Sequence, residues 1–274
     1  MPNMNETEVV ARRVLPIIYV IDTSGSMYGE RIAKVNQAML EMPRVLKDVS
    51  DSNPDAETQI GVLQFSTGSK WITPGLVSLE DYFWNKVDAG GTTMFAEMLG
   101  ELHAKLSRSE YLNNPIGYCK PVLIFMSDGE PTDADGVWEQ KIEWVKQNNK
   151  WFQHAIKIAI AIDDESDKDA LAKLVGTRES VIQVNDVNTL KTLIQALAVT
   201  SSMVGSKSRT SKDVNPTQQI IKEAVKGVDP KKIKMDDGKG NFVNPIPPTP
   251  SADPDPLIDP PAPVPGSWPT DTVW

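Results

Sequence analysis

The sequence has few of the residues that build covalent cross-links and transition-metal centres: one cysteine and two histidines in 274 residues. A single thiol, Cys119, cannot form an internal disulfide, and no Cys and His cluster has zinc-binding spacing. His103 and His154 have no cysteine or carboxylate at a recognisable metal or catalytic spacing, so we assign them to packing or surface roles. We therefore expect a reducing, cytoplasmic environment.

Positive charge and long apolar runs are also scarce. The 28 Lys and Arg residues stand against 37 Asp and Glu, a formal net charge of −9, so phosphate backbones should repel the chain and no nucleic-acid partner is expected. No apolar run approaches the roughly 18 residues of a membrane-spanning helix. Arg12 and Arg13 before an apolar run imitate a secretory signal, but that run is short and ends in Asp22. We expect a soluble protein without membrane contact.

Short apolar runs bounded by turn residues predict buried strands at 15–21, 59–65, 121–126, 156–162 and 181–184. Their near-continuous apolarity is typical of strands covered on both faces. Apolar residues spaced by three and four predict helices between them, at 32–49, 98–106, 138–148, 168–175 and 187–200. This alternation predicts an α/β fold: a doubly wound, mostly parallel central sheet with helices on both faces.

Two local features modify this pattern. The stretch 70–79 is too short for another crossover, so we expect an antiparallel edge strand there. Pro43 lies inside the first helical pattern, where a proline removes a hydrogen bond and costs roughly 3 kcal/mol. We therefore expect a kink or a new helix start at Pro43.

The composition changes near Thr200 and again near Asn244. We expect one domain over 1–200 and a linker over 201–243, with a short helix at 216–228 and a turn at 235–243. From 244 to 274, 11 of 31 residues are proline and none is Lys or Arg. Such a segment has too few apolar groups to offset the entropy of ordering, so we expect an irregular, extended or disordered acidic tail.

Three polar motifs follow the predicted strands or lie in the loops between them. Asp22, Ser24 and Ser26 stand at alternate positions after the first strand, GGTT at 90–93 supplies two hydroxyls, and Asp128 follows a later apolar strand. Ligands of open α/β sheets bind beyond the carboxyl ends of the strands, where such loops converge. Carboxylate and hydroxyl oxygens suit Mg²⁺, which typically keeps several waters. Two carboxylates only balance a divalent ion, so the metal should accept an outside Asp or Glu carboxylate.

The motifs Asp22-x-Ser24-x-Ser26, Gly91-Thr92 and Asp128-Gly129 resemble the metal-ion-dependent adhesion site of von Willebrand factor type A domains. The resemblance covers roughly 14–200 and implies that family's doubly wound fold. It also implies a non-catalytic adaptor that captures a protein partner through a carboxylate on Mg²⁺, with Mn²⁺ or Ca²⁺ as substitutes. The implied metal ligands are Asp22, Ser24, Ser26, Thr92 and Asp128. Thr93 is the competing candidate for the loop hydroxyl.

The strings VIDTSGSM, GGTTM and SDGEPTD look more narrowly like the bacterial cytoplasmic subgroup of tellurite-resistance (TerY-like) proteins. That subgroup implies association with a PP2C-type phosphatase and a serine/threonine kinase-like protein in stress-response or defence systems. The Pro-rich tail lies outside the resemblance.

The main alternative is a Mg²⁺-dependent phosphotransferase or phosphatase that uses Asp22 as nucleophile. Enzymes of the haloacid-dehalogenase type need a second Asp two residues later as general acid and base, and Ser24 stands there instead. Nucleotide-binding and serine-hydrolase motifs, GxxxxGK[ST] and GxSxG, are absent. Simpler interpretations make Ser24 and Ser26 helix caps and Asp128 a turn residue, but capping would not require the GGTT loop as well.

We interpret the other acidic residues near these motifs as loop or capping residues rather than as metal ligands. Glu130 and Asp133 are interpreted as solvated loop acids outside the metal site. The acidic run 163–167 follows a strand, so we interpret it as the cap of a helix at Lys168 rather than as a second cation site.

Overall fold

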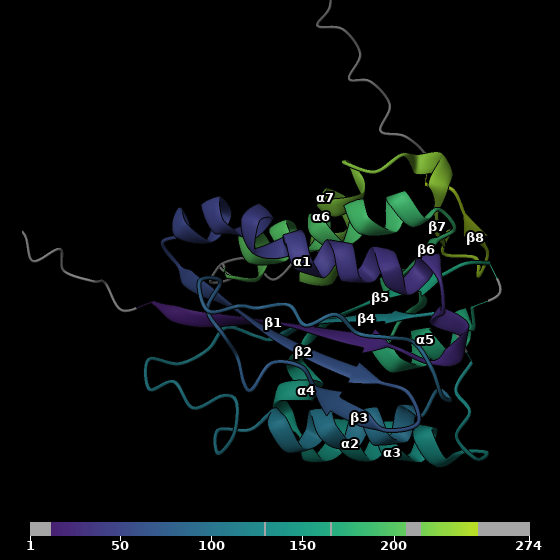
Figure 1. Ribbon diagram of the computed structural model, residues 1–274, viewed down its shortest axis with the longest axis horizontal. Coiled ribbons are helices and arrows are strands. Elements are labelled where there is room, and N and C mark those ends of the chain that lie inside the picture. Colours follow the sequence, from purple (N-terminus) through teal and green to yellow (C-terminus); the bar gives the residue numbers. More distant parts are fainter. Residues whose placement is uncertain (1–11, 129, 165, 207–214, 246–274) are drawn as a thin grey trace, which may run out of the picture.

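The central sheet has eight strands in the order β3-β2-β1-β4-β5-β6-β7-β8 (Figure 1). This computed structural model describes residues 12–128, 130–164, 166–206 and 215–245. Within them the strands are β1 (Arg13–Asp22), β2 (Ala56–Phe65), β3 (Ser69–Trp71), β4 (Val122–Ser127), β5 (Ile156–Ile162), β6 (Val181–Val184), β7 (Ile233–Asp236) and β8 (Phe242–Val243).

The five predicted buried strands form the parallel part of the sheet. Strand β1 pairs in parallel with both β2 and β4, and parallel pairing continues from β4 through β5 to β6. Strand β3 adds to β2 in the antiparallel sense, so the predicted edge strand is confirmed in a shorter form. The predicted α/β class with a mostly parallel sheet is confirmed.

Helices cover both faces of the sheet, with α1, α6 and α7 on one face and α2, α3, α4 and α5 on the other (Figure 1). Their bounds are α1 (Glu30–Asp51), α2 (Phe95–Lys105), α3 (Val137–Asn148), α4 (Lys150–His154), α5 (Lys168–Val175), α6 (Val187–Gly205) and α7 (Pro216–Val225). Alternate residues of β1 supply two separate cores. Ile17 packs in the core between the sheet and helices α1 and α6, whereas Ile18 packs in the core between the sheet and helices α2 and α3.

Helix α1 runs as one element through Pro43, so a new helix start at this residue is wrong. Its buried residues recur at helical spacing on one side, including Val35, Met39, Met42 and Leu46. Burial of this apolar stripe on both sides of the proline compensates for the missing hydrogen bond.

The segment after the predicted domain boundary joins the fold. Helix α6 continues past Thr200 to Gly205, and α7 lies against it with Ile220 and Ile221 fully buried. Strand β7 (four residues) pairs antiparallel with β6, and β8 (two residues) pairs with β7, so the end of the predicted linker extends the sheet. Most of the predicted Pro-rich tail, from 246 to 274, lies outside the described residues.

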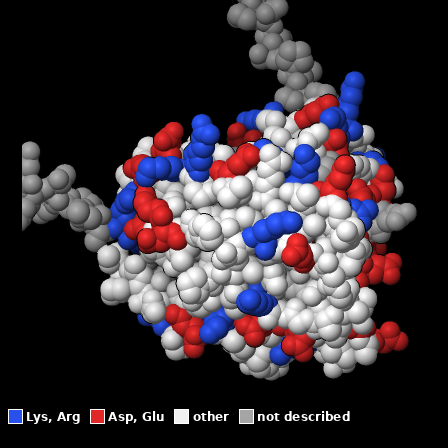
Figure 2. All heavy atoms as spheres, in the orientation of Figure 1, with Lys and Arg blue, Asp and Glu red and all other residues white. Residues whose placement is uncertain are grey.

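The surface shows no single-sign charged area on the face drawn in Figure 2, where acidic and basic side chains are interspersed. Over the ranges that the structure describes, no helix combines the length and apolarity needed to cross a bilayer.

A buried lysine gives the fold a measurable pH dependence. The Lys157 ammonium donates to the carbonyl oxygens of Phe152 (2.8 Å) and Ala155 (3.2 Å) at the end of α4, and burial lowers its pKa from 10.5 to about 8. Between these two pKa values the unfolded chain binds more protons than the folded one, so folding stability rises with pH there. Relative to Lys157→Met, the wild type should gain roughly 2 kcal/mol in free energy of unfolding between pH 7 and pH 10. Urea denaturation of both proteins measures this difference, and a difference independent of pH would contradict the assignment.

Candidate metal centre

The strand order reverses between β1 and β4. The chain continues from β1 to β2 on one side of this pair and from β4 to β5 on the other side. The carboxyl ends of β1 and β4 are therefore neighbours at the switch point, the usual ligand position of doubly wound sheets. Asp22 is the last residue of β1, Ser127 is the last of β4, and Asp128 follows it. All three are buried.

Asp22 is fully buried but has neutral hydrogen-bond donors on both carboxylate oxygens. The backbone N–H of Ser24 donates to Oδ1 (2.8 Å), and the hydroxyl of Ser127 donates to Oδ2 (2.6 Å). Burial raises the pKa of Asp22 to about 6, and the nearby Asp128 charge adds to the rise, although these hydrogen bonds oppose it. A bound cation at this position would relieve the cost of ionising Asp22.

The hydroxyls of Ser24 and Ser26 connect Asp22's loop to Asp128. Ser26 Oγ donates to Asp128 Oδ1 (2.7 Å), and the two serine hydroxyl oxygens lie 3.0 Å apart. Because Ser26 has one hydroxyl hydrogen, Ser24 is the donor between the two serines. Ser24 is buried and Ser26 is exposed, so this chain of oxygens extends from the interior to the surface.

The turn that carries these serines is the 3-10 turn η1 (Gly25–Met27). Gly25 does not have a positive φ, and a Cβ added to it would come no closer than 3.4 Å, to the Gly91 carbonyl oxygen. Its N–H donates to the carbonyl of Gly91 (3.0 Å), and the N–H of Gly90 donates to Thr23 (2.7 Å). These two hydrogen bonds hold the GGTT loop beside the serines.

Gly91 itself requires glycine, because its φ is 86° and an added Cβ would lie 2.5 Å from Thr67 Oγ1. That oxygen accepts from both the backbone N–H and the hydroxyl of Thr92, each at 3.1 Å. Thr92 is exposed at the edge of the site, whereas Thr93 is buried and its N–H donates to Thr132 Oγ1 (2.9 Å). The Thr92 hydroxyl thus bonds Thr67 rather than the other predicted ligands, and its role as a ligand stays a prediction.

Asn36 of α1 holds the long segment that leads to this loop. Its side-chain amide donates to the Val87 carbonyl (2.8 Å), and its oxygen accepts from the Trp84 indole (3.1 Å) and from the Val87 N–H (2.9 Å). These polar groups are buried away from water, so each hydrogen bond gives one of them the partner that water would otherwise supply. The segment between β3 and α2 is thereby fixed without helix or strand structure of its own.

Sequence reasoning missed three residues at this site: Ser127, Arg31 and Asp163. Ser127 directly precedes Asp128 at the end of a predicted strand, which was a usable signal. Arg31 and Asp163 carry no such signal, because they approach each other only after α1 and β5 pack on the sheet. The Arg31 guanidinium pairs with Asp128 (2.5 Å) and with Asp163.

The other acidic residues have structural roles. Asp133 accepts from the N–H groups of Phe95 (2.8 Å) and Ala96 (3.0 Å), so it caps α2 and is not simply a solvated loop acid. Asp167 caps α5 through the N–H groups of Asp169 and Ala170, which confirms the capping interpretation for that part of the acidic run.

The donor set fits a hard divalent cation. Asp22, Ser24, Ser26 and Asp128 bring carboxylate and hydroxyl oxygens to one place, and oxygen is the ligand atom that Mg²⁺, Mn²⁺ and Ca²⁺ prefer. No group of three or more His, Cys, Asp or Glu residues with metal-binding geometry occurs in the described part of the chain. The site therefore depends on hydroxyls as much as on carboxylates.

Removal of the hydroxyl that supports Asp22 should destabilise the fold. In Ser127→Ala, a buried carboxylate loses a donor, and we expect the free energy of unfolding without metal to fall by roughly 1–3 kcal/mol. Ser201→Ala is the matched control, because the Ser201 hydroxyl is buried without a hydrogen-bond partner and its loss should cost nothing. Urea denaturation in EDTA compares the two, and equal stabilities would contradict the role of Ser127.

The family model of the von Willebrand factor type A domain matches residues 17–196. The fold is similar to a von Willebrand factor type A structure from Catenulispora acidiphila, with a TM-score of 0.51 and 15% identity over 70% of this chain and 43% of that one. It is also similar to the pilus adhesin SpaC of Lactobacillus rhamnosus GG in its open conformation (TM-score 0.52, 13% identity, 69% of this chain and 30% of that one). The minor pilin PilB of Streptococcus sanguinis gives a TM-score of 0.52 and 12% identity, over 71% of this chain and 62% of that one.

This chain therefore spans less than two-thirds of each of those solved chains, and identities this low show the fold alone. No curated protein sequence gives a significant match. Because the matched region covers well over half of the sequence, and its sheet has the order and parallel pairing described above, the chain belongs to the von Willebrand factor type A domain family.

Proposed function

We propose that this protein is a non-catalytic adaptor that binds Mg²⁺ through a metal-ion-dependent adhesion site and captures a partner protein through an Asp or Glu carboxylate. Domains of this family are in general protein-interaction modules, often with a divalent metal site. The proposed ligands are Asp22, Ser24, Ser26, Thr92 and Asp128, with Mn²⁺ or Ca²⁺ as substitutes for Mg²⁺. The metal would supply an electrophilic centre for the partner's carboxylate.

The observation that carries this proposal is the hydrogen-bonded series from Asp22 through Ser24 and Ser26 to Asp128 at the switch point of the sheet. Two carboxylates from neighbouring strands repel each other there, and a divalent cation removes that repulsion. Since two carboxylates balance the charge of the ion and the hydroxyls add none, the complex can accept a further anionic ligand. The exposure of Ser26 and Thr92 leaves this side of the site open to a partner.

The phosphatase alternative is disfavoured by the surroundings of Asp22. A nucleophilic Asp of this type needs a second carboxylate nearby that protonates the leaving group and activates the water. The position two residues later holds Ser24, which cannot serve as a general acid and base near neutral pH.

Substitution of Asp22 tests the metal site directly. Asp22→Asn should abolish the Mg²⁺-dependent rise in melting temperature and the Mg²⁺-dependent capture of partners, because the amide lacks the ligating charge. The fold should persist, since burial already disfavours the ionised carboxyl. Thermal denaturation with Mg²⁺ and with EDTA measures the first effect, and pull-down from lysate under the same two conditions measures the second.

Asp135→Asn is the matched control, because Asp135 is exposed in the loop after Asp128 and lies outside the proposed ligand set. It should behave as the wild type does. A wild type that gains no stability from Mg²⁺ and captures the same proteins with and without EDTA would overturn the proposal. Hydrolysis of an aryl phosphate that is lost in Asp22→Asn would instead favour the enzyme.

We further propose partners of the kind implied by the tellurite-resistance resemblance: a PP2C-type phosphatase and a serine/threonine kinase-like protein in a bacterial stress-response or defence system. The three motif strings support this narrower assignment. Genes for such a kinase and phosphatase beside the gene for this protein would support it further. Their Mg²⁺-dependent co-purification with the wild type, but not with Asp22→Asn, is the decisive biochemical result.

A further inference from the structure

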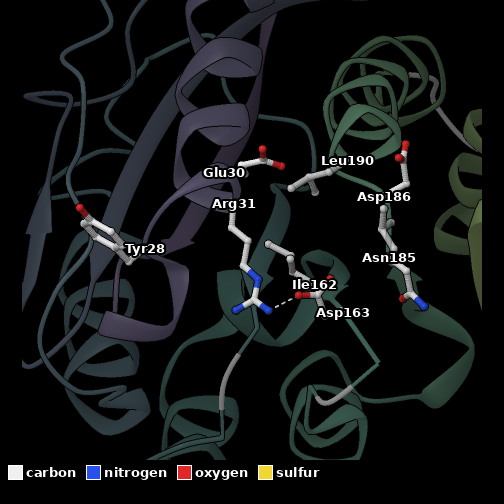
Figure 3. Close-up of a pocket in the computed structure, with 9 residues that line it drawn as sticks. Tyr28, Glu30, Arg31, Ile162, Asp163, Asn185, Asp186 and Leu190 are labelled. Atoms are coloured by element: carbon white, nitrogen blue, oxygen red, sulfur yellow. Dashed lines mark hydrogen bonds and ion pairs between the residues drawn. The ribbon is translucent and has the colours of Figure 1, made fainter.

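Arg31 in the first turn of α1 bridges the candidate metal centre and a second acidic residue. Its Nη1 donates to Asp128 Oδ2 (2.5 Å) and to the backbone carbonyl of Ser26 (2.7 Å). Its Nη2 pairs with Asp163, as the dashed line in Figure 3 shows. The guanidinium therefore contacts one oxygen of the Asp128 carboxylate while Ser26 Oγ contacts the other.

Asp163 directly follows β5 and pairs with the Arg31 guanidinium while its own backbone is in an unfavourable conformation. Its φ is 75°, the one positive φ of a non-glycine residue in the described ranges. Residues held in this region are strained and tend to cluster at functional sites. The conformation is kept by the Asp163 N–H, which donates to Val184 (2.9 Å), and by Ser166, whose hydroxyl donates to the Asp163 carbonyl (2.8 Å).

The Arg31 side chain also remains accessible. About a third of its surface is exposed, and it lines a pocket of about 230 Å³ together with Tyr28, Glu30 and Asp163 (Figure 3). Arginine carries its charge at every physiological pH and has five N–H donors in a planar fork, so it can contact an incoming carboxylate while it keeps its present partners.

The positive charge of Arg31 has opposite effects on the binding of Mg²⁺ and on the binding of a carboxylate ligand. The guanidinium lies within hydrogen-bond distance of a proposed metal ligand, far closer than the roughly 8–10 Å over which salt screens charges. Its charge repels Mg²⁺ and competes for Asp128. The same charge attracts a carboxylate that arrives at the metal.

We propose that Arg31, oriented by Asp163, sets the balance of this site by weakening the binding of Mg²⁺ and strengthening the binding of a carboxylate ligand. The inference rests on the proposed carboxylate-capture function and adds a specificity-determining residue to it. The affinity for Mg²⁺ is then low when no acidic ligand is bound. Each of the two, the metal and the acidic ligand, raises the affinity of the site for the other.

Three variants of the full chain test the proposal. Arg31→Gln should tighten Mg²⁺ binding about tenfold and weaken carboxylate binding several-fold, because one positive charge is removed near the metal. Asp163→Asn should weaken Mg²⁺ binding and strengthen carboxylate binding, because the Arg31 charge then lacks the negative charge of Asp163. Asparagine suits this position because it tolerates a positive φ. Arg44→Gln, the same change at an exposed position of the same helix, should change neither.

Titration calorimetry measures the affinity for Mg²⁺. Paramagnetic broadening of the acetate methyl resonance by the Mn²⁺-loaded protein measures the binding of a carboxylate. Melting temperatures check that each variant folds. A purely structural role for Arg31 would lower both affinities together, so the opposite signs are the diagnostic result.

The possible failures are distinguishable. If the wild type binds Mg²⁺ and acetate but Arg31→Gln changes neither affinity or lowers both, the role of Arg31 is wrong and the proposed function stands. If the wild type binds no divalent cation, both proposals are overturned.

Discussion

The closeness of two carboxylates at the ends of neighbouring parallel strands is the constraint on which the rest of this structure depends. Strands β1 and β4 are adjacent because the chain order reverses between them, and each ends in or beside an aspartate. The fold surrounds Asp22 with neutral donors, the Ser127 hydroxyl and the Ser24 N–H, and pairs Asp128 with the Arg31 guanidinium. Negative charge is thus concentrated at a point where Asp22 meets neutral donors and Asp128 meets a cationic side chain.

The surrounding loops keep this concentration in place through backbone hydrogen bonds. The N–H of Thr23 donates to Phe65 at the end of β2, and its carbonyl accepts from Gly90. These two hydrogen bonds tie the loop after β1 to β2 and to the GGTT loop, and the Thr132 N–H, which donates to the Thr93 carbonyl (2.8 Å), ties the GGTT loop to the segment after Asp128. Substitution of a ligand should therefore change the chemistry of the site more than its shape, which is the behaviour expected of a preorganised binding site.

Most of the fold could be predicted from sequence because each parallel strand is buried on both faces and reads as a short apolar run. The convergence of Asp22, Ser24, Ser26 and Asp128 could also be predicted, since the first three are close in sequence and Asp128 follows a buried parallel strand; their role as metal ligands stays a prediction. The helix near 216–228 could be predicted, but the addition of β7 and β8 to the sheet could not, because these strands are short and acquire their pairing only from the edge of β6. Arg31 and Asp163 were missed for a similar reason: they are 132 residues apart and meet only through packing.

The strands after the family region also determine how the sheet ends. Without β7, the buried strand β6 would present its unpaired N–H and C=O groups to other molecules, a common starting point for aggregation. With β7 and β8 in place, the two outer strands of the sheet are β3, with three residues, and β8, with two. Neither is long enough to template another chain, so β7 and β8 close this edge of the sheet against pairing with a second copy.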